Sequence, residues 1–472
     1  MSKELGLNKY NKSNLTILNW TFIILTGILC LLVLYISLIT TGTPLFLGLF
    51  AFSSLIIYLL LFKPKIWLYS TFLLTAIFTS TTGGGVDTID FIFIIYFNIF
   101  LYIWILWQIF IKKQKLIESK TEWLLISFYI LTLFTVINVV EDNTTFFNWI
   151  REYALLTLIL YYFPLKKYFN THKDIIRILI IFGITLLFID LFQFYIYKQI
   201  LSNITYAYQA GSSVRNNLYM FVVGSTVSCI FIFYQKKNIY RLLLSILFIL
   251  TLGALASTFA RVFWATAFLN IGIVFLLLNF KEKLKFITYL IISFSVAYLI
   301  ASIFFGDIFK FILFALETRF QSTSKGTTDI SALSRIEEWK IVIEKIKQSP
   351  FIGNGFGNVF TFKNPITDFM NYSSIIHNSF LHFAYRIGIP LTIMFFSVFI
   401  VNLAKSIYYS IKIRKDLFYK VLMISVSLSF ICLFITGMFT MTFILRDALI
   451  INATFFFFVN YVEVNYKNKL IN

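Results

Sequence analysis

The stretch at residues 375–401 reads IIHNSFLHFAYRIGIPLTIMFFSVFIV, and it marks the point where a long polar segment returns to apolar sequence. From Gly306 to Ile376 the chain is mixed, polar and charged, whereas most of the remaining chain is apolar. A membrane-spanning helix needs about twenty mostly apolar residues, and residues 380–401 supply such a run. The pattern therefore predicts a membrane protein with one large loop and a histidine, His377, where the loop re-enters the membrane.

The composition supports the same conclusion. Hydrophobic residues make up 59% of the chain and charged residues 13%, whereas soluble domains are about one-quarter charged. The net charge of +19 comes from short Lys and Arg clusters between apolar runs, which is typical of cytoplasmic loops and argues against nucleic-acid binding. The three cysteines, Cys30, Cys229 and Cys432, each lie inside an apolar run. They are expected to be buried hydrophobic side chains, without a disulfide or a zinc site.

About fourteen apolar segments are candidates for membrane spans. Three of them are short, which leaves a count of twelve or thirteen open. The segments are Leu15–Thr40, Leu45–Phe62, Ile66–Thr79, Phe91–Ile111, Trp123–Val140, Trp149–Phe163, Ile175–Tyr197, Leu218–Tyr234, Leu242–Leu255, Val262–Phe280, Leu284–Phe305, Phe380–Val401, Val421–Thr442 and Ala448–Val462.

The connecting loops indicate the orientation of these spans. Every second loop is basic, as in the cluster from Lys112 to Lys120, and the alternate loops are poor in Lys and Arg, as in Glu141-Asp142-Asn143. The positive-inside rule then places both termini in the cytoplasm and the large loop outside. We expect an all-α polytopic protein of the cytoplasmic (inner) membrane with about 12–14 transmembrane helices. Its one embedded domain comprises an N-terminal bundle (1–305), an extracytoplasmic loop (306–376) and C-terminal helices (377–472).

Within the loop, residues 334–349 are expected to form an amphipathic helix. Its apolar face would hold Ile336, Trp339, Ile343 and Ile346, while charged residues, Glu337 and Glu338 among them, would occupy much of the remaining surface. Ser334 is the expected N-cap, and Glu337 would complete a capping box. The glycine-rich run 353–357 follows. It predicts a tight turn rather than a nucleotide site, because no strand precedes it and no P-loop lysine follows it.

Arginines at the outer ends of spans are the candidate anion ligands. Arg215 and Arg261 have no acid nearby in the sequence, and guanidinium groups bind phosphate oxygens in a bidentate fork. Pairing with an acid or snorkelling to the head groups is the alternative. The other outer arginines are Arg151, Arg335, Arg386 and Arg446.

His377 is the candidate general base, because a neutral imidazole accepts a proton near physiological pH. A purely structural role is the alternative. His382 lies five residues further on and should face elsewhere on a helix. The sequence has no HExxH motif and no acidic pair of the DxD type in its outer loops. We therefore expect no metal and no cofactor, which disfavours a metal-dependent nucleotide-sugar transferase.

Three motifs in order give the chain a family resemblance. They are Ser334-Arg335-Ile336-Glu337-Glu338-Trp339, then Pro350-Phe351-Ile352-Gly353-Asn354-Gly355-Phe356-Gly357, and then His377-Asn378-Ser379-Phe380-Leu381 with Gly388 beyond. Together they resemble the O-antigen ligase and O-antigen polymerase superfamily of bacterial envelope enzymes. The Ser257–Trp264 stretch is similar, more loosely, to the serine-arginine segment of that family.

The resemblance implies a GT-C-like fold and metal-independent, inverting glycosyl transfer. The donor would be a glycan on undecaprenyl diphosphate at the outer face of the membrane. Arg215 and Arg261 would hold the departing diphosphate, and His377 would deprotonate the acceptor hydroxyl of a second glycan. Asn378 would orient the imidazole or contact substrate, with Arg335, Arg151 and Arg386 in support. A flippase and a chain-length regulator would be further partners, and nucleic acid would not.

Several functions remain open at this point. A polymerase of lipid-linked repeat units (O-antigen, capsule or exopolysaccharide) is favoured over a ligase acting on lipid A-core, because about fourteen spans exceed what a ligase is expected to have. A lipid-linked oligosaccharide flippase is the main alternative of another class. It should line a central cavity with charges at mid-depth, where the sequence offers chiefly Asp190. Transport of another anion is a third possibility.

Overall fold

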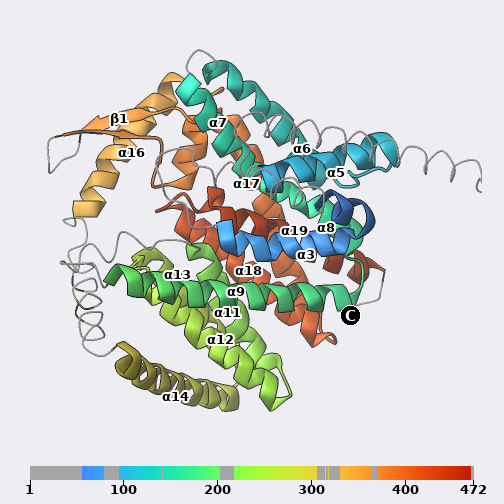
Figure 1. The fold of residues 1–472 in the computed structure, drawn as a ribbon, viewed down its shortest axis with the longest axis vertical. Helices are drawn as coiled ribbons and strands as arrows, with labels where there is room; N and C mark the ends of the chain where they lie inside the picture. The colour runs from blue at the N-terminus through green and yellow to red at the C-terminus, as the bar shows by residue number, and fades with distance from the viewer. Residues whose placement is uncertain are drawn as a thin grey trace, which may run out of the picture.

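The structure is a computed structural model that describes residues 56–78, 95–139, 143–201, 217–305, 330–363 and 369–468, together with the single residues Phe314, Glu317 and Gln321. The described residues form a predominantly helical, all-α protein (Figure 1). The first expected span, most of the second and the candidate ligand Arg215 lie outside the described residues.

The first half of the chain supplies a series of helices that often change helical type without a break. Residues 95–111 form one continuous helix, in which π-helical turns at 95–99 and 107–111 flank α5, and the 3-10 residues 157–161 join α7 to α8. The capping box of Ser119 and Glu122 starts α6. The helices are α3 (Pro64–Phe78), α5 (Phe100–Leu106), α6 (Lys120–Leu133, followed by 3-10 residues 134–139), α7 (Asn143–Leu156), α8 (Tyr162–Tyr168) and α9 (His172–Leu201).

Two groups of helical hairpins follow, separated by a small unit of one helix and two strands. Short turns join consecutive helices within each group, so that neighbours along the chain are antiparallel. The first group is α11 (Leu218–Tyr234), α12 (Asn238–Ser257), α13 (Arg261–Leu277) and α14 (Phe280–Phe305). The small unit is α16 (Ile330–Gln348) with the antiparallel strands β1 (Phe360–Lys363) and β2 (Met370–Ser373), in which Phe360 lies opposite Ser373. The second group is α17 (Ser379–Lys412), α18 (Leu417–Gly437) and α19 (Arg446–Lys467).

The observed helices confirm the expected apolar segments wherever the chain is described. The expected segment Leu218–Tyr234 coincides with α11, and most other bounds differ by a few residues. Six described helices are long and apolar enough to cross a membrane, namely residues 120–138, 172–196, 238–257, 379–412, 417–437 and 446–467. The protein is therefore an all-α polytopic membrane protein, and the total number of spans remains a prediction.

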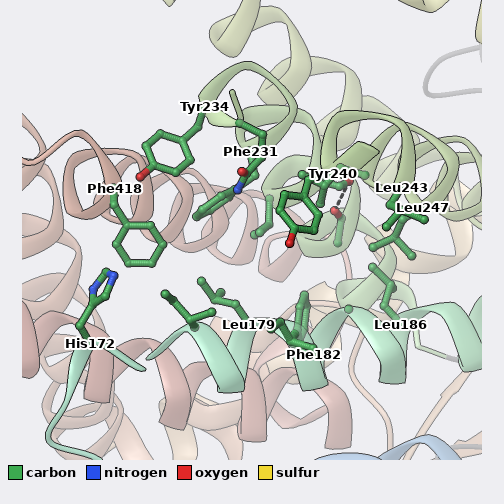
Figure 2. Close-up of a pocket in the computed structure, with 18 residues that line it drawn as sticks. His172, Leu179, Phe182, Leu186, Phe231, Tyr234, Tyr240, Leu243, Leu247 and Phe418 are labelled. Carbon is green, nitrogen blue, oxygen red and sulfur yellow. Dashed lines mark hydrogen bonds between the residues drawn. The ribbon is translucent and has the colours of Figure 1, made fainter. Parts of the chain in front are cut away.

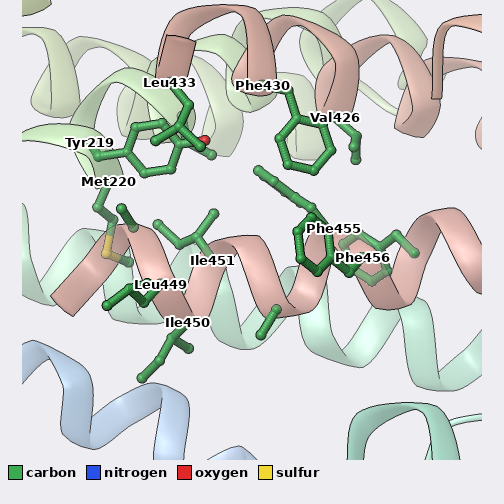
Figure 3. Close-up of a cluster of buried hydrophobic side chains, with 14 of the residues drawn as sticks. Tyr219, Met220, Val426, Phe430, Leu433, Leu449, Ile450, Ile451, Phe455 and Phe456 are labelled. Atoms are coloured by element: carbon green, nitrogen blue, oxygen red, sulfur yellow. The ribbon is translucent and has the colours of Figure 1, made fainter. Parts of the chain in front are cut away.

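The core of the bundle is built around α19. Buried residues make up 78% of the most apolar 18-residue stretch of α19, compared with 22% for that of α12. A helix that is apolar all round belongs in the interior. Figure 3 shows side chains of α11 and α18 meeting α19, with Tyr219 near Ile451 and with Phe430 near Phe455. The rings of Phe430 and Phe455 lie 5.8 Å apart, nearly perpendicular. This packing joins the two groups of hairpins into one body.

Helix α17 is broken at Gly388, and the exposure of its side chains differs on the two sides of the break. That residue has a φ of 78° inside the helix, and Pro390 follows two residues later. Nearly all residues from Ser379 to Gly388 are buried or half-buried, whereas Ile389, Ile393 and Ile400 are exposed. The first part of α17 is thus enclosed by protein, and the part beyond the break presents an apolar face suited to lipid.

Hydrogen bonds gather the starts of several helices at one end of the bundle. Asp447, at the start of α19, accepts a hydrogen bond from the backbone amide of Met220, at the start of α11, at 2.9 Å. Ser379, at the start of α17, donates to the carbonyl of Thr440 in the connection to α19 at 2.8 Å. The short α12–α13 turn lies at this end too, because α12 runs antiparallel to α11. We call this end of the bundle the His377 end. Helix α16 and strand β1 lie together at one side of the molecule, away from the C-terminus (Figure 1).

Candidate active site

His377 lies directly before α17 and is held by one carboxylate. Glu338 of α16 accepts a hydrogen bond from the His377 backbone amide at 2.6 Å, and its second oxygen lies 2.8 Å from the imidazole Nδ1. The Glu338 side chain is 2% exposed, whereas the imidazole is 45% exposed. The ring is thus anchored from inside the protein and still accessible from outside.

The tautomer of the ring follows from this contact. An ionised carboxylate can only accept hydrogen bonds, so Nδ1 carries the proton. The lone pair of a neutral imidazole then resides on Nε2. A carboxylate that fixes the tautomer and orientation of a histidine is the arrangement by which general bases are prepared in hydrolases. The pair can therefore accept a proton from a hydroxyl group that approaches Nε2.

Glu338 reaches His377 because it lies on the buried face of α16. Glu338, Val342 and Ile346 follow one another at four-residue spacing and are 2%, 0% and 8% exposed. Val342 and Ile346 belong to a small core with aromatic residues of β1 and with Tyr385 of α17. The helix therefore packs against the hairpin and α17 through this stripe.

Three expectations for this helix are wrong. The apolar face was expected to include Ile343, which is 41% exposed, and Glu338 was expected on the surface. The face is rotated because the buried carboxylate is compensated by two N–H groups of His377 and can occupy a core position. Ser334 is not the N-cap either, since α16 begins at Ile330 and Ser334 lies inside the helix. Residues such as Ala332 and Leu333 favour this earlier start.

Asn378 caps α17. Its side-chain oxygen accepts hydrogen bonds from the amides of Phe380 at 2.9 Å and Leu381 at 3.1 Å. An asparagine N-cap satisfies amide groups that the first helical turn leaves without partners. Asn378 therefore fixes the backbone next to His377, and its described contacts are with the helix rather than with the imidazole.

Arg386 lies inside the protein. Its guanidinium is 0% exposed and forms an ion pair with Glu152 of α7 at 3.0 Å. It also donates to the carbonyl of Gly355 at 3.5 Å and to the carbonyls of Asn358 and Ser374. Because Ser374 is three residues before His377, Arg386 positions the loop that carries the histidine rather than facing an external ligand.

The glycine-rich run forms the expected tight turn. Gly353, Gly355 and Gly357 have φ angles of 74°, 84° and 76°, which favour glycine. The amides of Asn354 and Gly355 donate at 2.8 Å to the carbonyls of Tyr385 and Arg386 in α17, and the amide of Gly357 donates to Glu152 at 3.0 Å. These amides are occupied, so the turn does not provide a phosphate cradle.

The break in α17 makes this docking possible. Pro390 has no N–H to offer to the carbonyl of Arg386, and the amide of Ile389 donates to Pro350 at 2.7 Å instead of to Tyr385. The helix thereby leaves two carbonyls without helical partners, and the glycine turn satisfies both. A Cβ atom at Gly388 would clash with the carbonyl oxygen of Phe351.

The remaining candidate arginines are distributed around this region. Arg335 lies on α16 one turn before Glu338, Arg151 adjoins Glu152 on α7, and Arg261 is the first residue of α13 at the His377 end. All three are half-buried and have interactions with other residues. The structure thus brings His377, Asn378, Arg335 and Arg386 into one neighbourhood and places Arg261 at the same end of the bundle.

The sequence reasoning missed Glu338 and Glu152 as partners of His377 and Arg386. A signal for Glu338 was present, since it shares four-residue spacing with Val342 and Ile346. Glu152 gave no such signal, because it is 234 residues from Arg386. Among the described residues, no group of three His, Cys, Asp or Glu side chains could hold a metal ion.

Comparison with known families addresses this part of the chain. Residues 246–396 match the O-antigen ligase family. The matched segment includes Arg261, Glu338 and His377, and it confirms the resemblance to the O-antigen ligase and polymerase superfamily. No curated protein matches the chain. Over these residues the chain is similar to enzymes of the O-antigen ligase or polymerase type, and this similarity supports, in general terms, lipid-linked glycan substrates and a membrane setting.

Proposed function

We propose that the protein is a polymerase that joins oligosaccharide repeat units carried on undecaprenyl diphosphate, by inverting glycosyl transfer at the outer face of the cytoplasmic membrane. The observation that carries this proposal is the contact of His377 with Glu338, in which a buried carboxylate orients an accessible imidazole. The family match over the same residues supports glycosyl transfer as the reaction.

The reaction would proceed as a single displacement. A hydroxyl group of the acceptor glycan gives its proton to Nε2 of His377, and its oxygen attacks the anomeric carbon of the donor. The bond between that carbon and the phosphate oxygen breaks, and its electron pair leaves with the diphosphate. Base catalysis of this kind contributes typically 10²–10⁴-fold to the rate.

The leaving diphosphate would be stabilised by arginine. Arg261 is the first residue of α13, where the dipole of the helix adds positive potential. Arg215 precedes α11 by three residues and would contribute from the segment outside the described residues. Preorganised cations at the position where charge develops are among the largest contributions to catalysis.

A ligase that transfers the glycan to lipid A-core or another acceptor is the second candidate, favoured by the description of the matching family. It would use the same donor chemistry with a different acceptor.

The test is a reconstitution with full-length purified protein and a lipid-diphosphate repeat unit, without metal or nucleotide. A ladder of extended glycans would support the polymerase. Transfer seen only when lipid A-core is supplied would support the ligase. Movement of the lipid-linked unit across vesicles without any new glycosidic bond would contradict both.

A further inference from the structure

A partly enclosed space lies between α9 and the hairpin of α11 and α12. It is a cavity of about 550 Å³, a volume within the range of small-molecule sites. Its lining includes Leu179 of α9, Leu247 of α12 and Phe418 of α18. Figure 2 shows α9 along one side, with Tyr234, Phe231 and Tyr240 facing it from the other. We call this cavity the α9 groove.

The α9 groove lies at the end of the bundle opposite His377. His172, the first residue of α9, and Gln235, in the α11–α12 turn, both line it. That turn belongs to one of the basic loops, with Lys236, Lys237 and Arg241 close together in the sequence. The groove is therefore separate from the candidate active site, and its polar end lies among lysines and arginines.

The sides of the groove open toward the lipid. Ile180 on α9 and Leu243 on α12 are each 55% exposed, although both line the groove. Both helices are candidate membrane spans. Side chains exposed on such helices face hydrocarbon, so a ligand would enter the groove from within the bilayer and would itself be largely apolar.

Positive charge lies beside the polar end of the groove. Arg241 does not line the groove itself, but it follows the lining residue Tyr240 and donates from Nε to the backbone carbonyl of Gln235, another lining residue, so its guanidinium lies beside the groove. Its two Nη groups have no acceptor among the residues that the structure describes. Of the acids nearby, Asp174 is paired with Lys65 at 2.9 Å, and Asp416 caps α18 through the amide of Tyr419 at 3.4 Å.

We propose that the α9 groove binds an anionic glycerophospholipid from the leaflet that faces the basic loops. One acyl chain would occupy the apolar part of the groove, and the lipid phosphate would accept hydrogen bonds from the Nη groups of Arg241. Guanidinium and phosphate match in charge and geometry, and the cytoplasmic leaflet of a membrane is rich in anionic lipids. The bound lipid would hold α9 against α11 and α12, and this role is independent of the proposed glycosyl transfer.

Two glycines permit a matched test of the groove. Gly183 lines it, and a Cβ atom there would meet only Leu247, at 3.8 Å, an ordinary contact. Gly183→Leu should therefore fill the groove without disturbing the helices. Gly272 on α13 has no atom within 4 Å of an added Cβ and lies away from the groove, so Gly272→Leu makes the same change in another apolar helix.

The experiment measures lipid binding to the full-length protein in detergent by native mass spectrometry, with phosphatidylglycerol, phosphatidylcholine of the same acyl chains, and undecaprenyl phosphate as probes. We expect phosphatidylglycerol to bind about tenfold more tightly than phosphatidylcholine, which corresponds to one charge-assisted contact. Gly183→Leu should weaken phosphatidylglycerol binding at least about tenfold, while Gly272→Leu should leave it unchanged.

A second pair of variants tests the head group. Arg241→Gln should abolish the preference for phosphatidylglycerol, whereas Lys281→Gln, which removes a cation from the start of α14, should preserve it. Equal binding to Gly183→Leu and Gly272→Leu would overturn the groove as the site. A preference for phosphatidylcholine or for undecaprenyl phosphate, or no binding at all, would overturn the proposed ligand.

Discussion

Two acid–base contacts near the same end of the molecule have opposite surroundings. In one, buried Glu338 holds His377, whose imidazole is 45% exposed. In the other, Glu152 is 13% exposed and holds Arg386, which is 0% exposed and also binds backbone carbonyls. The first contact leaves one nitrogen atom available to a substrate, and the second leaves no face of the guanidinium available. His377 and Arg386 are nine residues apart, and sequence position alone does not distinguish their roles; the burial of the two side chains does.

The largest effect should come from removing the exposed base. His377→Ala should reduce glycan polymerisation about 10²–10⁴-fold, because the proposed acceptor of the hydroxyl proton is removed. The thermal unfolding temperature should fall only in part, because buried Glu338 loses its imidazole partner but keeps the backbone amide of residue 377, and the helix cap Asn378 is unchanged. Chain length on gels and thermal unfolding of the same preparation check this prediction. Full-length polymer from the variant would remove His377 from the mechanism.

Arg386→Met should act mainly on the stability of the protein, whereas His377→Ala acts mainly on its activity. Removing the buried guanidinium leaves largely buried Glu152 with only the Gly357 amide and takes the donor from three backbone carbonyls, so it should destabilise the protein by about 3–5 kcal/mol, seen as a loss of folded protein or a lower unfolding temperature. The double variant with Glu152→Met should recover part of this loss, because no unpaired charge remains. A stable single variant that lacks only activity would place Arg386 among the substrate-binding groups.

Glu338→Gln tests whether the first contact positions the base. The amide keeps the size of the side chain but no longer enforces one tautomer of His377, so kcat should fall about 10²-fold with little change in KM. Glu337→Gln on the neighbouring, more exposed side chain is the control and should be near wild type. If the two variants behaved alike, Glu338 would be only a buried structural acid.

Gly388→Ala tests the second contact through the backbone. The observed φ of 78° and ψ of 166° are accessible mainly to glycine and cost other residues about 1–3 kcal/mol. The added Cβ would also displace the carbonyl of Phe351. We expect a lower unfolding temperature, whereas Gly272→Ala, at an open helical position, should be neutral or slightly stabilising. Unchanged stability of Gly388→Ala would show that the glycine turn docks loosely.

The smallest effect is expected for Arg261→Lys. Lysine keeps the charge but loses the planar fork, so turnover should fall about tenfold if Arg261 binds the diphosphate in a bidentate manner. Steady-state rates with the lipid-linked donor would measure this. Arg414→Lys in the α17–α18 connection is a matched control that should retain normal turnover. Equal rates for the two variants would reduce Arg261 to a general positive charge.

The sequence by itself determined the helical segments and their order. Apolar runs and the basic loops between them are local signals, and the observed bounds of α11 and α13 follow them closely. It also determined that His377 stands at the start of a span and that the glycine-rich run turns tightly.

Only the tertiary structure decided which charged side chains became accessible and which became buried. Glu338 contacts His377 across 39 residues, and Glu152 contacts Arg386 across 234. The packing of the helices determines these contacts. Helix α16 packs its buried stripe of Glu338, Val342 and Ile346 against α17. The break at Gly388 leaves two carbonyls of α17 without helical partners, and the glycine turn donates hydrogen bonds to them. A buried charge is stable only beside its partner, so its role follows from the assembled structure and not from the order of residues along the chain.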